Sequence, residues 1–379
     1  HGIDAHNARH LRFRNLFIKD TFPHVFDEGI NDGTNTGGNG ILCRSGVEDV
    51  LVDNLFGWHC GYDTVSLIGA NGKVTNSSSF RQGNRGFSGD YRDEPASTFH
   101  VANCISESGT YPASAFGVRG SVGGSTRGSD FKLSNSMAFM RDGATGRRSV
   151  SIRSIDNFTV ENITAYGQNL NGSPIIILDG HDGEVDNVYV EGSPEHGIEM
   201  DADCANVTVN SSYIKSPAAK GVLAQGNHIS VGGGTRIYEP DDVGVDMQAN
   251  NSDIGRVTVT SPGVHGAGIP GDDVMVDGFR VENANGDGIS IGGEDVNIES
   301  VKISGSGAQM IDVDDATRPR WRGVIYGGPM GGVDLSSVTG QYEGDRAIAN
   351  GNSAADAGDE ASWDSANAQW RVFQPTTTV

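Results

Sequence analysis

Ionisable and aromatic side chains concentrate between residues 58 and 119 of this 379-residue sequence. Histidine, tyrosine and arginine can accept or donate a proton, and arginine can also neutralise a carboxylate through paired hydrogen bonds. Together they suit proton abstraction next to a carboxylate on an acidic sugar. The candidate catalytic residues are His59, Asp63, Arg81, Arg85 and Tyr91. The candidate substrate-binding residues are Trp58, Tyr62, Arg92, His100, Tyr111 and Arg119.

The most specific part of this group is the pair Arg81 and Arg85, which are four residues apart in an irregular stretch. Both guanidinium groups could bind one anionic sugar. The alternative is that they are surface arginines paired with the neighbouring acids Asp90, Asp93 and Glu94.

Paired carboxylates would indicate a different chemistry, because glycosidases place two of them either about 5 Å or about 6.5–9.5 Å apart. The candidates are Asp20, Asp27, Glu28, Asp63 and Asp90. However, the sequence contains 49 acidic residues, and a solvated acidic surface explains these positions equally well.

Oxygen-rich turns are the one indication of a metal. The run "DVDD" places Asp312, Asp314 and Asp315 within four residues, and such carboxylates could bind calcium. The run matches no calcium-binding motif, so an acidic turn is the alternative. No other cofactor is predicted.

Composition argues against nucleic acid as a partner. Against 49 acidic residues the chain has 27 Lys and Arg, a net charge of -22, whereas phosphate binding needs clustered positive charge. Only 6 of these 27 are lysines, and an acidic, lysine-poor surface is typical of salt-loving organisms. An ordinary acidic secreted protein is the alternative. No apolar run is long enough to span a membrane.

The four cysteines, Cys43, Cys60, Cys104 and Cys204, form no CxxC pair. We therefore expect them to pack as small apolar side chains, with a Cys43–Cys60 bridge as the alternative.

Apolar residues between Thr235 and Asp315 recur every 22 residues. The shared places include Val257, Phe279 and Val301, and also Ala267, Ile289 and Ile311. Each copy reads as short alternating strands separated by Gly, Asn, Asp and Ser turns. One copy cannot bury its apolar side alone, so copies must stack into a solenoid.

The earlier part of the chain repeats a related pattern, in which two apolar residues at i and i+2 precede an asparagine at i+4. These asparagines are Asn15, Asn54, Asn135 and Asn162. The pattern resembles the right-handed parallel β-helices of the pectate-lyase-like superfamily, in which such asparagines often stack as a ladder. The resemblance covers about residues 2–315. It implies an all-β solenoid fold and leaves activity open, because this fold has many functions.

We predict a parallel β-helix over residues 1–315, with an inserted loop region at 76–127, and a C-terminal β module or cap at 316–379. The final segment lacks the repeat but holds Trp321, Trp363 and Trp370, and "EASWDSANAQWRVF" suggests a hairpin. Its style resembles tail-fibre and spike modules of halophilic archaeal viruses. The first residues already fit the strand pattern, which suggests a longer protein or an end covered by a partner.

These features favour an extracellular or virion-surface spike that binds a polysaccharide or glycoprotein glycan, as a homotrimer. Whether it also cleaves the glycan is left open. The first alternative is a secreted polysaccharide lyase or glycoside hydrolase, and the second is a passive adhesin stalk.

Overall fold

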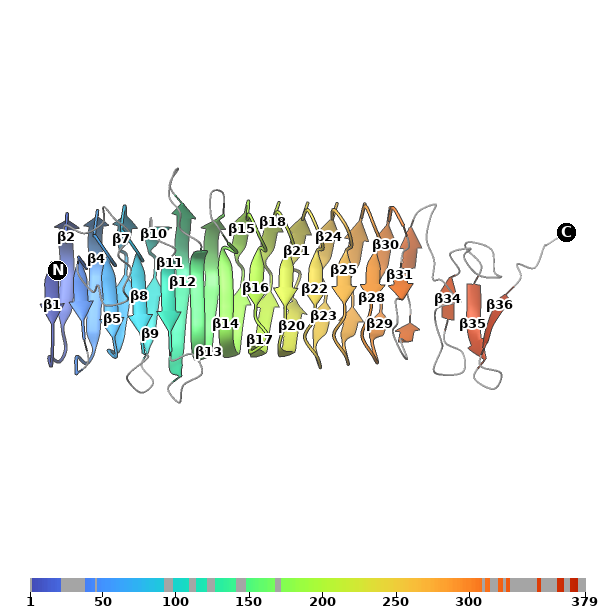
Figure 1. The fold of residues 1–379 in the computed structure, drawn as a ribbon, viewed down its shortest axis with the longest axis horizontal. Helices are drawn as coiled ribbons and strands as arrows, with labels where there is room; N and C mark the ends of the chain where they lie inside the picture. Colours follow the sequence, from blue (N-terminus) through green and yellow to red (C-terminus); the bar gives the residue numbers. More distant parts are fainter. Residues whose placement is uncertain are drawn as a thin grey trace, which may run out of the picture. The chain divides into compact units, whose positions relative to one another are not determined.

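The computed structural model describes residues 2–21, 38–44, 46–91, 98–108, 114–120, 127–140, 148–167, 172–308, 311–313, 320–322, 325–327, 346–348, 360–364 and 369–373. The chain divides into two compact units, His1–Val207 and Thr208–Val379. Every regular element of the described residues is a strand (Figure 1). None of these residues forms a helix long and apolar enough to cross a membrane.

The first unit contains long and short strands in parallel pairing. They are β1 (Ile3–Ala5), β2 (Arg12–Lys19), β3 (Ile41–Cys43), β4 (Val50–Trp58), β5 (Val65–Ile68), β6 (Gly72–Thr75), β7 (Ser78–Phe80), β8 (Phe87–Asp90), β9 (Phe99–Ala102), β10 (Ile105–Ser108), β11 (Ser114–Arg119), β12 (Gly128–Met140), β13 (Arg148–Tyr166), β14 (Ile175–Asp186), β15 (Tyr189–Glu191), β16 (Ile198–Met200) and β17 (Ala205–Asn210). Five of them, β7 to β11, lie within the range predicted as an inserted loop region.

The second unit contains shorter strands. They are β18 (Tyr213–Lys215), β19 (Val222–Ala224), β20 (Asn227–Gly232), β21 (Arg236–Tyr238), β22 (Val245–Met247), β23 (Asp253–Gly255), β24 (Thr258–Thr260), β25 (Ala267–Ile269), β26 (Met275–Asp277), β27 (Arg280–Glu282), β28 (Ile289–Ile291), β29 (Asn297–Glu299), β30 (Lys302–Ser304), β31 (Ile311–Val313), β32 (Arg320–Arg322), β33 (Ile325–Gly327), β34 (Arg346–Ile348), β35 (Glu360–Asp364) and β36 (Gln369–Phe373). The pairing is parallel up to β33 and antiparallel in β34–β36. The expected hairpin is present, with Trp363 opposite Trp370.

Both units are therefore parallel β-solenoids, and the predicted right-handed parallel β-helix is confirmed. In the second unit, Ala267 pairs with Ile289 and Ile289 with Ile311, so these strands pair at the interval of the sequence repeat. In the first unit, Phe87 pairs with Phe116 and Phe116 with Val150, and both intervals are wider. The rungs at this point of the first unit thus contain extra residues between their strands.

The strands of the first unit form three faces, named here for one strand each. The β5 face contains β1, β3, β5, β8, β11 and β16 with the first parts of β13 and β14. The β6 face contains β6 and β9 with the first part of β4 and the middle parts of β12 and β13. The β7 face contains β7, β10 and β15 with the last parts of β2, β4, β12 and β13.

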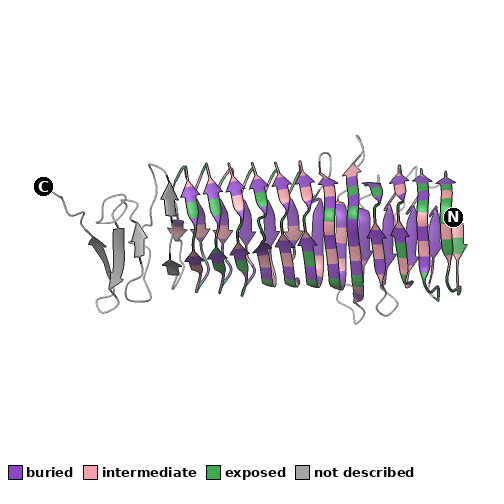
Figure 2. Cartoon of the chain, turned by 180° about the vertical axis from the view of Figure 1, so that it is seen from behind, coloured by how far each residue is buried: buried purple, intermediate pink, exposed green. Residues whose placement is uncertain are grey.

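Burial alternates along the strands because successive side chains point to opposite sides of a sheet (Figure 2). On the β6 face the inward places stack aliphatic residues directly above one another. Val52, Val74, Val101, Leu133 and Val160 follow in register, and each is at most 1% exposed. Burying each such side chain contributes about 1.5–3 kcal/mol, so these stacks supply most of the driving force for folding.

The predicted asparagine ladder is present. Asn15, Asn54, Asn135 and Asn162 all have left-handed backbone, with φ between 47° and 56°. The Asn54 amide donates to the Asn15 Oδ1 at 2.8 Å, and the Asn162 amide to the Asn135 Oδ1 at 3.0 Å. Asn187, which the sequence pattern missed, extends the ladder by donating to Asn162 at 2.6 Å. Asparagine suits these corners because it tolerates the left-handed conformation and its amide bridges adjacent rungs.

All four cysteines are buried and unpaired, so the predicted packing is confirmed and the Cys43–Cys60 bridge is not formed. Burial raises the pKa of Cys43, Cys104 and Cys204 to about 12. We therefore expect no reaction of the folded protein with a thiol reagent at neutral pH, and four reactive thiols after denaturation. Spectroscopic titration with and without denaturant measures this. Rapid labelling of any thiol in the folded chain would contradict it.

Candidate functional site

The residues predicted to form one site lie in several places. Trp58, His59 and Arg81 are on the β7 face, where the Arg81 guanidinium lies 4.8 Å from the Trp58 ring centroid. His59 Nδ1 contacts the Asp20 carboxylate at 2.8 Å, and this contact is the main cause of the lowered pKa of Asp20. His100 is on the β6 face between Lys73 and Lys132. Burial, aided by these two lysines, lowers the pKa of His100.

Tyr91 belongs to the core, fully buried, with a hydroxyl that has no hydrogen-bond partner among the described residues. Gly89 and Gly128 leave the space it fills, since a Cβ on Gly128 would lie 2.7 Å from its ring. Burial raises the pKa of Tyr91. Arg92 and Tyr111 lie outside the described residues.

The β5 face brings together Tyr62, Asp63, Arg85 and Arg119. Arg85 precedes β8, and its side chain lies across Gly117 of β11, where a Cβ would come within 3.0 Å of the Arg85 Cδ. Glycine at this position therefore leaves room for the aliphatic part of the Arg85 side chain to pack against the sheet. The missing side chain at Gly117 is what allows a guanidinium to reach over the face.

Asp63 holds the Arg85 segment in place from below. It is 1% exposed, and its carboxylate accepts hydrogen bonds from Asn84 Nδ2 at 2.7 Å, the Arg85 backbone N–H at 2.9 Å and Ser88 Oγ at 2.5 Å. Burial raises the pKa of Asp63, opposed by Arg85 and these donors. In this position Asp63 orients the arginine.

A second guanidinium sits at the end of the same strands. Arg119 donates to one oxygen of Asp90 through Nε at 2.9 Å and Nη2 at 2.6 Å. In register beyond Arg119 comes Arg153 of β13, a residue that sequence reasoning missed. No ion pair involves Arg85 or Arg153 in the described part of the chain.

Tyr62 completes this arrangement, which we call the arginine cluster: Tyr62, Arg85, Arg119 and Arg153. Burial and the nearby Asp63 raise the pKa of Tyr62, whereas Arg85 and Arg119 lower it. The cluster can neutralise carboxylates with its guanidinium groups, and the tyrosine hydroxyl can donate or accept a proton. No pattern in the sequence indicated Arg153, because its role depends on register with Arg119.

The five carboxylates considered for a two-acid mechanism do not form a described pair. Asp27 and Glu28 lie outside the described residues. Asp20 contacts His59, Asp63 is buried under Arg85, and Asp90 binds Arg119. Each of these three is engaged by a cationic side chain or by backbone.

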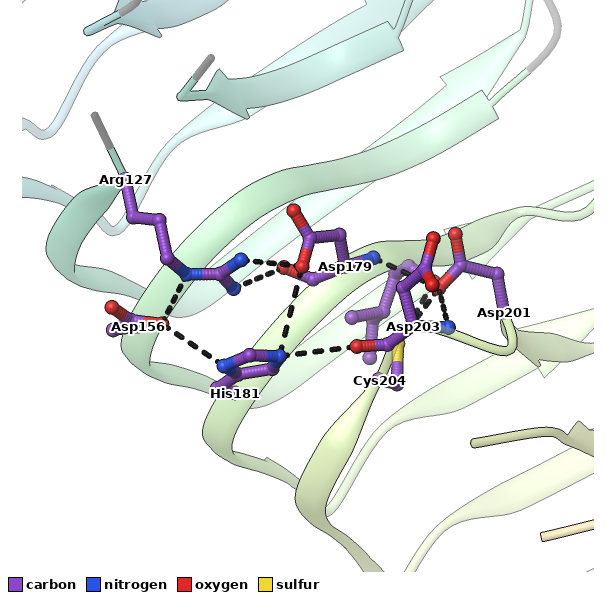
Figure 3. A network of polar contacts seen from close by, with 8 residues as sticks. Arg127, Asp156, Asp179, His181, Asp201, Asp203 and Cys204 are labelled. Carbon is purple, nitrogen blue, oxygen red and sulfur yellow. Dashed lines mark hydrogen bonds and ion pairs between the residues drawn. The ribbon is translucent and has the colours of Figure 1, made fainter. Parts of the chain in front are cut away.

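A separate polar network in the first unit was not predicted (Figure 3). Arg127 contacts both Asp156, at 2.6 Å, and Asp179. His181 lies against the same two carboxylates, at 3.5 and 3.6 Å, and its Nε2 is 3.1 Å from the Asp203 carbonyl oxygen. Burial lowers the pKa of Arg127, but its bonds to Asp179 and Asp156 outweigh this and raise it. Arg127 and both carboxylates each have a partner of opposite charge within the network, which indicates a structural role.

The second unit has its own polar cluster. Lys220 contacts Asp246, and His265 Nδ1 lies 3.1 Å from Asp287 Oδ2. The hydrogen bond to Asp287 raises the pKa of His265. Of the predicted calcium ligands, Asp312 is half-buried, while Asp314 and Asp315 lie outside the described residues. The residues that are described contain no group of three His, Cys, Asp or Glu side chains placed to hold a metal.

No protein-family model and no curated protein matches this chain. Among solved structures, the mannuronan C-5 epimerase AlgE4 A-module of Azotobacter vinelandii is similar, with a TM-score of 0.52, 13% identity, and coverage of 78% of this chain and 91% of that one. A double mutant of the periplasmic alginate epimerase AlgG has a TM-score of 0.52, 13% identity, and coverage of 77% and 75%. The tailspike of bacteriophage Det7 has a TM-score of 0.42, 10% identity, and coverage of 96% and 86%.

At 13% identity the similarity to the two epimerases shows the fold alone. They support the parallel β-helix expected from the repeat. None of these three structures comes from a halophilic archaeal virus, and that part of the resemblance stays a prediction.

Proposed function

We propose that this protein binds an acidic polysaccharide through the arginine cluster on the β5 face. The observation that carries the proposal is the row of guanidinium groups on one face of a chain whose net charge is -22. A strongly acidic protein repels an acidic glycan everywhere except where positive charge is gathered. No ion pair of Arg85 or Arg153 is found among the described residues, which supports a role for these two side chains in binding an anion.

The spacing of the cluster suits a chain-like ligand. Asp90, Arg119 and Arg153 occupy successive rungs in register, and rungs are about 4.8 Å apart. A polysaccharide lying along this row would meet a cation on more than one rung. The two epimerases with the same fold are named for mannuronan and alginate, both polyuronates, which supports an anionic sugar as the ligand.

The proposal leaves open whether the protein also acts chemically on the glycan that it binds. Proton abstraction next to a uronate carboxylate needs a cation to stabilise the developing charge and a group to take the proton. Arg85 and Arg119 supply the first, and Tyr62, whose pKa both arginines lower, is the candidate for the second. A lyase or an epimerase would then lose turnover in Tyr62→Phe while retaining glycan binding. Unsaturated uronate detected by absorbance would identify a lyase, and new reducing ends alone would identify a hydrolase.

We expect Arg85→Gln and Arg153→Gln each to weaken binding of a polyuronate by about tenfold, because each removes one charge-assisted contact. Binding is measured by calorimetry with alginate and with a neutral glucan as probes. Arg14→Gln is the matched control, since Arg14 is an exposed arginine of β2 whose neighbour in register is Asp53. Equal binding by all three variants, or equal affinity for the neutral glucan, would refute the proposal.

The wider assignment is a surface spike, at the cell or virion surface and assembled as a homotrimer. A passive adhesin stalk is the alternative, favoured if no glycan binds. A calcium requirement at Asp312, Asp314 and Asp315 is tested within the same titrations by adding a chelator, which should lower affinity if the ion contributes.

A further inference from the structure

Most of the large apolar side chains that are exposed among the described residues lie in one row. Phe17 is 65% exposed, Phe56 38%, Ile105 39% and Met137 37%. The row is continuous, because Phe17 pairs with Phe56, Phe56 with Ser78, Ser78 with Ile105, and Ile105 with Met137. These five residues, called the apolar row, cross five adjacent strands of the β7 face.

Aromatic side chains widen the row on one side. The Phe56 and Trp58 rings are 6.3 Å apart and nearly parallel, and Phe80 lies 5.5 Å from Phe56 and 6.3 Å from Trp58. Phe139 continues the contact from Phe80 at 6.0 Å. Glu107 pairs in register with Phe139 but is only 4% exposed, so the exposed side chains form an apolar surface about 20 Å long, from the spacing of five rungs. Apolar surface of this extent marks an interaction site in a soluble protein.

A sugar fits this surface poorly. Stacking on a sugar requires a free ring face, but Phe17 and Phe56 stack on each other at 5.4 Å and 13°. The Arg81 guanidinium lies over the Trp58 ring. Ile105 and Met137 offer neither a ring nor a hydrogen bond. By contrast, Phe, Trp, Met and Arg are the residue types enriched at protein–protein interfaces.

A second copy of this chain fits well, for two reasons. Two chains with a net charge of -22 can approach closely only where charge is absent, and the apolar row contains no charged residue. A second copy also presents the same row at the same rung spacing. Ser78, in register between Phe56 and Ile105, is the small side chain of the row, and a large side chain of the facing row can pack opposite it.

On other strands, the outward-facing positions hold charged side chains. On the β6 face, Lys73, His100 and Lys132 lie in register. In the second unit, Arg236, Thr258, Arg280 and Lys302 lie in register on β21, β24, β27 and β30. Charged rows of this kind keep a solenoid surface soluble, which makes the neutral row on the β7 face distinctive.

We propose that copies of this chain associate through the apolar row, burying Phe17, Phe56, Ile105 and Met137 against the same residues of a neighbouring copy. The inference does not depend on glycan binding, although it gives the proposed homotrimer a contact surface. Sedimentation of the full chain over a wide concentration range at high salt measures the assembled mass. The wild type is expected to form an oligomer, and the variant Phe17→Ser/Ile105→Ser to dissociate at concentrations at least tenfold higher than the wild type.

Two controls make the test specific. Val264→Ser/Met275→Ser removes side chains of similar exposure, 38% and 42%, that lie outside the row, and should leave the mass unchanged. Arg85→Gln should keep the oligomer while losing glycan affinity, which separates this inference from the proposed function. Unchanged circular dichroism of each variant establishes that it is folded, and Ile105→Lys repeats the test with a single change.

A monomeric wild type at every concentration would overturn the inference. So would an oligomer that the row variants leave intact. Loss of glycan binding by Phe17→Ser/Ile105→Ser at unchanged mass would assign the row to the glycan and overturn it as well.

Discussion

Gly293→Ala is expected to lower the free energy of unfolding by about 3 kcal/mol. A Cβ on Gly293 would lie 1.9 Å from the carbonyl oxygen of Gly271, one rung earlier. That oxygen is backbone, and both turns are tied to their neighbours: Gly271 N–H bonds to Met247 O and Gly293 N–H to Ile269 O. The rungs cannot separate locally without breaking these bonds. Chemical denaturation followed by circular dichroism measures the loss.

Gly255→Ala is the matched control, because the nearest atom to its added Cβ is 4.0 Å away. Here alanine restricts the unfolded chain and causes no clash in the folded one. We therefore expect the free energy of unfolding to stay the same or to rise by up to about 1 kcal/mol. If the two variants are equally stable, close stacking of turns is not what holds the second unit together.

Asp63→Ala is expected to have a similarly large effect, about 3 kcal/mol, because it removes the acceptor of Asn84 Nδ2 and of the Arg85 N–H and leaves Ser88 Oγ with longer contacts. Asp63→Asn should cost much less. Its Oδ1 can still accept from Asn84 and the Arg85 N–H, and its Nδ2 can donate to Ser88 Oγ, as a protonated aspartic acid would. The same variants should lower glycan affinity, Ala more than Asn, if Asp63 acts by positioning Arg85.

The stability difference between the wild type and Asp63→Asn should depend on pH in a definite direction. Burial raises the pKa of Asp63 above its ordinary value of 3.8, so the folded protein holds this proton more tightly than the unfolded chain. The stabilisation of the folded state by protonated Asp63 is therefore complete below pH 3.8, and it is lost as the pH rises through the raised pKa. Relative to the wild type, Asp63→Asn should be least stable in acid and recover toward neutral pH. A constant difference across this range would show that the pKa of Asp63 is the same in the folded and unfolded states, which contradicts the prediction.

The fold followed from local patterns. Each of these patterns involves residues that are close in the sequence or one repeat apart: turn residues, alternating apolar positions and a fixed repeat length. Because the repeat length is constant, residues one rung apart can be identified from the sequence. The asparagine ladder was predictable for the same reason, since left-handed backbone at Asn54 or Asn162 is a property of one residue and its turn.

The site depended on information that no local pattern holds. Rungs of the first unit differ in length, as the pairing of Phe116 with both Phe87 and Val150 shows, and this shifts which face each side chain reaches. Trp58 and Tyr62 are close in the sequence, yet one lies on the β7 face and the other beside the β5 face. Tyr91 is buried because glycines in other strands leave room for it.

Register between distant strands also decided the two proposed surfaces. Arg119 and Arg153 are far apart in the sequence, as are Phe17 and Phe56, but parallel pairing places each pair side by side. Repetition in the sequence therefore specifies a stacked coil, because stacking is the one way to bury its short strands. The length of every intervening turn determines which side chains share a face. These lengths are known once the strands are seen paired in the tertiary structure.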